Sequence, residues 1–155
     1  MPNGQRLIAL TATMLGLLTV APALTAASRC PNLSGVYMLQ GEDGQVHISI
    51  RQRKCDSVTI IRKSDYLGTT TSETHILTLD GKEQPDSPWY GHSPVQNISS
   101  AKFVGSELVI DVKVAGDSPL TVFYSLNSER DLQEEALIDR RRDRRGSPSV
   151  AKRER

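Results

Sequence analysis

The chain has 155 residues, of which 37% are hydrophobic and only 5% aromatic, and its formal net charge at pH 7 is +1. This length suits one small domain, and the low aromatic content argues against a large aromatic-lined pocket. The near-neutral total hides an uneven distribution, because residues 140–155 carry a net charge of +6 and Arg6 adds one more positive charge. Residues 28–139 therefore carry a net charge of −6, which predicts an acidic domain with a basic tail.

The N-terminal segment has the pattern of a secretory signal peptide. Arg6 precedes an uncharged stretch over residues 7–28, which is apolar at its centre and ends in small residues. An uncleaved anchor is the alternative, since roughly 20 apolar residues cross a bilayer, but Pro22 and the small-residue end favour cleavage. We predict that residues 1–27 are a signal peptide and that the mature protein is secreted or periplasmic. Nucleic acid is a poor partner for an exported protein.

The two cysteines, Cys30 and Cys55, both lie in the mature part of the chain. An even number of cysteines in a small exported domain predicts a disulfide, and only one intramolecular pairing exists. Two free buried thiols are the alternative. A metal site is not predicted, because two thiolates need further ligands and the nearest histidine, His47, stands alone.

The mature chain alternates between short apolar runs and turn residues, which predicts an all-β domain. Eight strands are expected, at residues 33–40, 46–51, 58–63, 69–79, 95–104, 108–114, 120–126 and 132–138. The last of these would also suit a short helix, because it contains Gln133-Glu134-Glu135-Ala136-Leu137. Strands at hairpin spacing, with no helix-length segment between them, pair antiparallel with their neighbours in sequence.

The predicted fold over residues 28–139 is therefore an eight-stranded antiparallel meander that closes into a small barrel. Closure removes the two exposed edges of the sheet, and eight strands enclose either packed side chains or one small ligand. A two-sheet β-sandwich is the alternative.

The opening of the mature chain, residues 30–37, reads Cys-Pro-Asn-Leu-Ser-Gly-Val-Tyr. It resembles the opening of the calycins, the lipocalin- and avidin-like barrels, in which Gly-x-Trp lies on the first strand. Tyr37 stands where those proteins have the tryptophan. The resemblance implies an up-and-down barrel, but the later aromatic residues of an avidin biotin site are not recognisable.

No catalytic motif is present: the chain has no Gly-x-Ser-x-Gly elbow, no His-Glu-x-x-His, no phosphate loop and no dinucleotide fingerprint. The three histidines, His47, His75 and His92, lie far apart in the sequence. We therefore predict no catalytic residue, no metal and no cofactor, and expect that the protein is not an enzyme. A small hydrolase without a recognisable motif remains a third interpretation.

A long connection over residues 81–94 is the best candidate for a binding site, because long loops without regular structure are often functional. Trp89, Tyr90 and His92 are the candidate binding residues, since adjacent Trp and Tyr offer large flat surfaces with hydrogen-bonding groups. The alternative is that Trp89 plugs one end of the barrel.

The C-terminal tail, residues 140–155, has almost no apolar residue and is predicted to be disordered. Its positive charge could hold the protein on an anionic membrane surface, fold back on the acidic domain, or remain solvated.

Taken as a whole, the pattern predicts an exported β-barrel that binds a small apolar ligand. Its cavity would be lined by the strand faces that carry Val46, Val58 and Leu108. The alternative is a filled barrel that binds a protein, for example as an inhibitor of an extracellular enzyme, through the loop around Trp89.

Overall fold

The computed structural model describes residues 30–41, 44–90, 97–138 and 148–154, and over these ranges the protein is built from ten β-strands. The strands are β1 (Gly35–Gln40), β2 (Gly44–Arg53), β3 (Ser57–Tyr66), β4 (Thr69–Thr78), β5 (Gln84–Asp86), β6 (Asn97–Val104), β7 (Glu107–Lys113), β8 (Leu120–Leu126), β9 (Leu132–Ile138) and β10 (Ser149–Arg153). Within the described ranges, no helix has the length and apolar character needed to cross a membrane.

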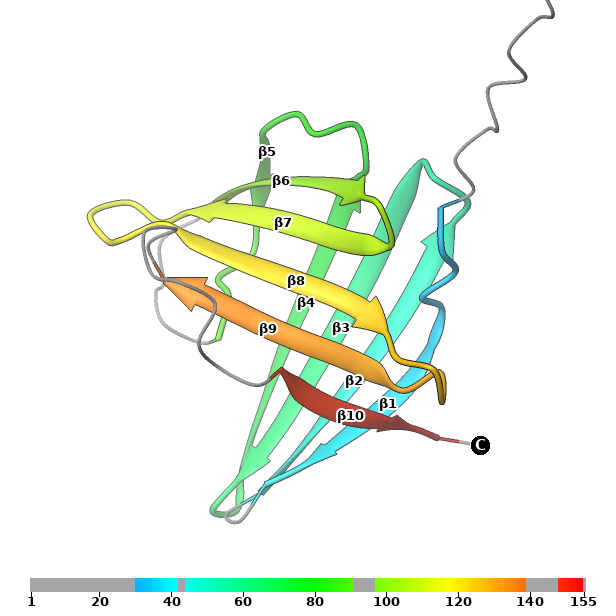
Figure 1. The fold of residues 1–155 in the computed structure, drawn as a ribbon. Helices are drawn as coiled ribbons and strands as arrows, with labels where there is room; N and C mark the ends of the chain where they lie inside the picture. The colour runs from blue at the N-terminus through cyan, green and yellow to red at the C-terminus, as the bar shows by residue number, and fades with distance from the viewer. Residues whose placement is uncertain (1–29, 42–43, 91–96, 139–147, 155) are drawn as a thin grey trace, which may run out of the picture.

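The strands form one antiparallel up-and-down sheet that is nearly closed into a barrel (Figure 1). Strands β1 to β4 and strands β5 to β10 each pair with their neighbours in sequence, and the first and last strands also pair, with Tyr37 of β1 opposite Arg153 of β10. The only step without a hydrogen-bonded ladder lies between β4 and β5, although these two strands are in contact. The fold class is therefore the predicted one.

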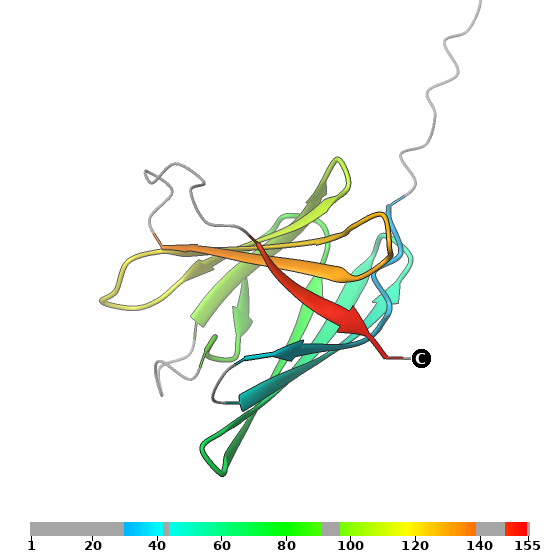
Figure 2. The same cartoon turned by 60° about the horizontal axis from the view of Figure 1, so that its bottom comes forward.

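The barrel has ten strands rather than the predicted eight, and both additional strands are short. β5 occupies three residues of the connection that was expected to have no regular structure. The segment Leu132–Ile138, for which a helix was the alternative, is strand β9. The sandwich alternative is wrong, because β10 pairs with both β1 and β9 and so joins the two walls into one sheet (Figure 2).

The prediction that the tail is disordered is wrong for Ser149–Arg153, which forms β10. This strand buries Ala151, which is 1% exposed, against the core. Charged residues next to Ala151 contact the rest of the domain: Lys152 Nζ lies 2.6 Å from Asp131 Oδ2, and Glu154 Oε1 lies 3.0 Å from His47 Nδ1. The basic tail thus folds back on the acidic domain over these residues, whereas residues 140–147 lie outside the described ranges.

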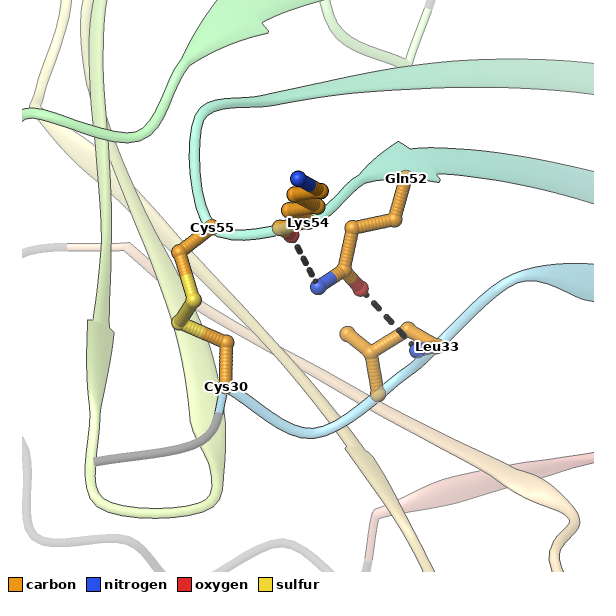
Figure 3. The surroundings of a disulfide bond; sticks show 5 residues. All are labelled: Cys30, Leu33, Gln52, Lys54 and Cys55. Atoms are coloured by element: carbon orange, nitrogen blue, oxygen red, sulfur yellow. Dashed lines mark hydrogen bonds between the residues drawn. A yellow bond between two sulfur atoms is a disulfide. The ribbon is translucent and has the colours of Figure 1, made fainter. Parts of the chain in front are cut away.

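One end of the barrel, which we call the closed end, is fastened by the predicted disulfide. Cys30 and Cys55 are bonded with their Cα atoms 5.7 Å apart (Figure 3). The chain between Cys30 and β1 covers this end, where the Leu33 amide donates to Gln52 Oε1 at 3.0 Å. Gln52 in turn donates through Nε2 to the Lys54 carbonyl at 2.6 Å. The side chain of Gln52 therefore connects both sides of the disulfide loop.

The opposite end, which we call the open end, contains the connections β1–β2, β3–β4 and β7–β8. β2 approaches β3 closely there: a Cβ on residue 44 would lie 2.1 Å from the Asp65 carbonyl oxygen, so only glycine fits at Gly44. At the closed end, Tyr37 is fully buried and donates its hydroxyl to the Leu33 carbonyl at 2.8 Å. The residue at the calycin tryptophan position is therefore a core residue and does not line the open end.

The inward faces of the strands form the core, which is apolar toward the closed end. Its members are Leu33, Tyr37, Ile48, Ile50, Val58, Ile60, Leu77, Trp89, Ala101, Leu108, Ile110, Val112, Val122, Tyr124, Leu132 and Ala151. Of the residues expected to line a cavity, Val58 and Leu108 belong to this packed core, and Val46 packs against it. The prediction that Val58 and Leu108 line a cavity is therefore wrong, because both side chains are packed in the core.

Candidate functional site

On four strands the inward face changes from apolar to polar in the direction of the open end. Inward-facing positions are two residues apart in a strand, so on each strand an apolar inward residue is followed, toward the open end, by a polar one. The pairs are Ile60 and Arg62 on β3, Leu77 and His75 on β4, Ala101 and Ser99 on β6, and Leu132 and Glu134 on β9. These polar side chains are buried. The barrel therefore contains a buried polar layer between its apolar core and its open end.

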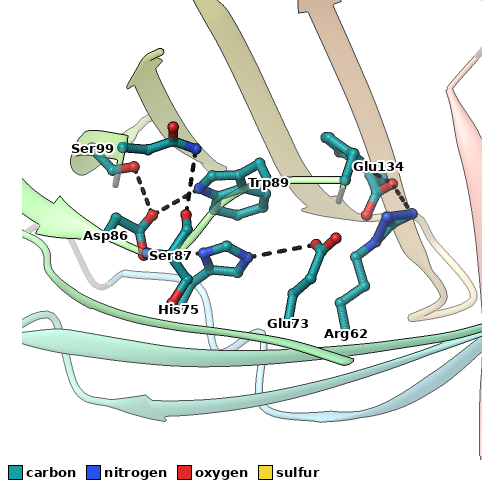
Figure 4. Close-up of polar contacts among 10 residues, drawn as sticks. Arg62, Glu73, His75, Asp86, Ser87, Trp89, Ser99 and Glu134 are labelled. Carbon is teal, nitrogen blue, oxygen red and sulfur yellow. Dashed lines mark hydrogen bonds and ion pairs between the residues drawn. The ribbon is translucent and has the colours of Figure 1, made fainter. Parts of the chain in front are cut away.

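Asp86, at the end of β5, is the centre of one half of this layer (Figure 4). Its carboxylate accepts hydrogen bonds from His75 Nδ1 at 3.0 Å, from Ser99 Oγ at 2.6 Å and from Trp89 Nε1 at 2.7 Å. The Ser87 amide donates to the same carboxylate at 2.8 Å. Burial alone would raise the pKa of Asp86, but these hydrogen bonds and the His75 charge outweigh it and lower the pKa.

His75 lies between two carboxylates and is stacked on Trp89. Its Nε2 is 3.8 Å from Glu73 Oε2, and its ring centroid is 3.6 Å from that of Trp89, with only 14° between the ring planes. Burial would lower the pKa of His75, but Asp86 and Glu73 together raise it above its ordinary value. The pKa of Glu73, which burial would raise, is lowered by His75, by the Tyr90 amide and by Arg62. The layer thus stabilises a charged imidazolium.

Arg62 and Glu134 form the other half of the layer. Arg62 Nη2 lies 3.1 Å from Glu134 Oε1, and both side chains are buried. The guanidinium lies over the ring of Tyr90, 4.4 Å from its centroid, and the Tyr90 hydroxyl lies 3.5 Å from the same Glu134 oxygen. Burial, with Glu134 nearby, raises the pKa of Tyr90 and of Tyr124, so both phenols stay protonated.

Several buried polar atoms of this layer have no hydrogen-bond partner. They include Arg62 Nε, Glu73 Oε2, His75 Nε2, Tyr124 Oη and Glu134 Oε2. An unpartnered polar atom away from water is costly, and native proteins tolerate few of them. Two of the five, Glu73 Oε2 and His75 Nε2, face each other at 3.8 Å, which is an ion pair but too long for a hydrogen bond.

Next to the polar layer, a pocket of about 560 Å³ opens at the open end of the barrel. Its lining comes from the ends of β6 to β9, the β7–β8 connection and the residues after β5: Trp89, Tyr90, Asn97, Val114, Asp117, Ser118, Leu120, Ala136 and Ile138. Ile138 is on the inward face of β9, yet it is 64% exposed. This part of the inward face is therefore uncovered apolar surface rather than packed core.

The predicted binding residues have different positions. Trp89 is 3% exposed and belongs to the core, so the structure places it as the plug that was the alternative to an exposed recognition residue. Tyr90 follows with a φ of 57°, in the left-handed region, and its side chain contacts both Arg62 and Glu134. Both residues line the pocket. His92 lies outside the described ranges.

Sequence reasoning missed the residues of the polar layer, namely Arg62, Glu73, His75, Asp86 and Glu134. A signal exists for Arg62 and Glu134, because each occupies the inward phase of a strand that begins with apolar residues in that phase, whereas the same phase of β4, which carries Glu73 and His75, is mostly polar. Asp86, in contrast, lies on a strand of only three residues that carries no such periodicity.

Ser99 donates to Asp86 and not to His75, so Ser99, His75 and Asp86 do not form the serine–histidine contact of a catalytic triad. Among the described residues, no group of three or more His, Cys, Asp or Glu is placed to hold a metal ion. No protein-family model matches the sequence.

The charged state of His75 predicts how stability depends on pH. Because the folded protein raises the pKa of His75, this contribution is complete below its unfolded pKa of about 6.5 and is lost as the pH rises through the folded pKa. Glu73 and Asp86, whose pKa values are lowered, contribute above about pH 4 and lose their contribution as the pH falls through their folded pKa values. The free energy of unfolding should therefore be largest at mildly acidic pH.

Urea denaturation between pH 4 and pH 9, followed by circular dichroism, measures this dependence. The variant His75→Gln should lose the decline above about pH 6.5, whereas His47→Gln, which changes only a half-exposed ion pair with Glu154, should keep it. A decline that persists in His75→Gln would show that another group causes it.

Proposed function

We propose that this protein is an exported binding protein that takes up a small, largely apolar molecule through the open end of its barrel. The pocket carries this proposal. Its volume of about 560 Å³ is that of ordinary ligand pockets, which are apolar concavities with a few polar groups that fix orientation. Six of its nine lining residues are aromatic or aliphatic, and Asn97, Asp117 and Ser118 supply the polar groups.

The overall architecture supports the same proposal. An up-and-down meander closed by its first and last strands is compatible with the calycin resemblance at residues 30–37, and barrels of this kind hold ligands at their mouths. The disulfide is consistent with the proposed export, because disulfides persist in oxidising compartments. Recognition of a protein through Trp89 has less support, since the indole is buried and offers no anchor.

The test is binding of a neutral apolar dye, N-phenyl-1-naphthylamine, to the oxidised protein. We expect saturable binding with increased dye fluorescence. The variant Ile138→Glu should weaken binding at least about tenfold, because a charge at the pocket wall disfavours an apolar ligand. Ile138 is exposed, so this variant should remain folded.

The matched control is Ile76→Glu. Ile76 is 68% exposed, almost as much as Ile138, but it lies on the outward face of β4 and does not line the pocket. Dye affinity should be unchanged in this variant. Absence of saturable binding, or an equal loss in both variants, would contradict the proposed function. If the dye binds as expected, mass spectrometry of molecules extracted from the purified protein would identify the natural ligand.

A further inference from the structure

We propose that the ligand of the pocket carries an ammonium head, which binds to the Glu73 and Glu134 carboxylates of the buried polar layer. This inference rests on the proposed function and specifies the chemical class of the ligand. The apolar body of the ligand would occupy the pocket, and its head would pass Tyr90 into the layer.

The first argument is the charge of the layer. It contains three carboxylates, from Glu73, Asp86 and Glu134, and two cations, from Arg62 and His75. Even with His75 protonated, the layer has one negative charge in excess. His75 is shared between Asp86, at 3.0 Å, and Glu73, at 3.8 Å, so Glu73 is only partly neutralised and a site of this composition favours the binding of one further cation.

The second argument is the set of atoms that lack partners. Glu73 Oε2 and Glu134 Oε2 are buried and accept no hydrogen bond, and the Tyr124 hydroxyl beside Glu134 is also unpartnered. Ionised carboxylates only accept hydrogen bonds, so these oxygens require donors. A primary ammonium group has three donors and a positive charge, so it would supply both the donors and the charge that such a site requires.

The third argument is access. Glu134 precedes Ala136 by one inward position on β9, and Ala136 lines the pocket. Tyr90 lines the pocket, and its hydroxyl lies 3.5 Å from Glu134 Oε1. Displacement of this one side chain would connect the pocket to the layer.

A carboxylate head fits the same place poorly. Arg62 is the only arginine of the layer, and its guanidinium is already paired with Glu134 and covers the Tyr90 ring. An anion beside it would also face the carboxylates of Glu73 and Glu134, and like charges in a buried site repel strongly. The composition of the layer therefore discriminates against acids and in favour of amines.

The experiment compares three probes with the same alkyl chain: octylamine, octanol and octanoate. Trp89 is the only tryptophan and lines the pocket, so its fluorescence reports binding without a label, and isothermal titration calorimetry gives an independent affinity. At pH 7 we expect octylamine to bind at least about tenfold more tightly than octanol, and octanoate to bind more weakly than octanol.

The outcomes separate this inference from the proposed function. Equal affinity for octylamine and octanol would overturn the ammonium site while leaving the apolar pocket intact. Preference for octanoate would overturn it in favour of an anion site at Arg62. Failure of all three probes to bind would count against the proposed function itself.

Variants of the carboxylates test the assignment of the site. Glu134→Gln should abolish the preference for octylamine and leave octanol affinity unchanged, because the apolar pocket is retained. Glu73→Gln should reduce the preference in the same direction and serves if Glu134→Gln does not fold. The control is Glu135→Gln, one residue along β9 on the opposite face of the strand. If both Glu73→Gln and Glu134→Gln fold and keep the full preference, the proposed site is wrong.

Discussion

Replacing Trp89 with alanine is expected to lower the free energy of unfolding by about 3–5 kcal/mol, the usual cost of truncating a large buried aromatic residue. The indole is 3% exposed, stacks on His75 and donates a hydrogen bond to Asp86 at 2.7 Å. The variant would leave a cavity in the core and remove one of the donors that hold the Asp86 carboxylate. Urea denaturation followed by circular dichroism measures the loss without depending on tryptophan fluorescence.

The control for this prediction is Tyr66→Ala. Tyr66 is an aromatic residue at the end of β3, it is 56% exposed, and it lies outside the core cluster. Its removal should change stability by less than about 0.5 kcal/mol. A comparably small effect for Trp89→Ala would show that the indole does not plug the barrel, and would return the residue to the role of an exposed recognition group.

Deleting residues 149–155, which removes β10, is expected to cost on the order of 5 kcal/mol. The strand has five register partners, two on β1 and three on β9, and each backbone hydrogen bond contributes about 1 kcal/mol. The deletion also uncovers the core around Ala151 and exposes two strand edges, which promotes aggregation. Thermal unfolding and size-exclusion chromatography of the truncated protein measure both effects.

A synthetic peptide of residues 148–155 provides the control. Added to the truncated protein, it should restore thermal stability in a concentration-dependent manner, because it supplies the missing strand. A peptide of the same composition in scrambled order should not, since Ala151 would no longer face the core. Unchanged stability after the deletion would contradict the place of β10 in the barrel.

Local sequence patterns were sufficient for most of the wall of the barrel. Leu108, Ile110 and Val112 alternate with more polar residues along β7, and this period of two needs no tertiary information. The disulfide was also predictable from the sequence, because two cysteines in an exported domain allow only one intramolecular pairing. Turn residues between the strands then favoured antiparallel pairing of neighbours.

β10 illustrates why the rest could not be predicted. Only Ala151 of its five residues is buried, and the segment is basic, so composition alone indicates a solvated tail. The strand is stabilised by pairing with β1, more than a hundred residues earlier in the chain, and by acidic partners such as Asp131. Neither interaction leaves a signal within the segment itself.

The amino-acid sequence by itself determined the all-β class, the antiparallel order of neighbouring strands and the disulfide, because periodicity, turn chemistry and cysteine count act over short distances or allow one solution. Only the tertiary structure decided the closure by β10 and the buried polar layer. Arg62, His75 and Glu134 lie on three different strands. Barrel closure places all three side chains in the same buried interior. Their ion pairs and hydrogen bonds form only when strands that are far apart in the chain come close together, so these interactions cannot be read from any single segment.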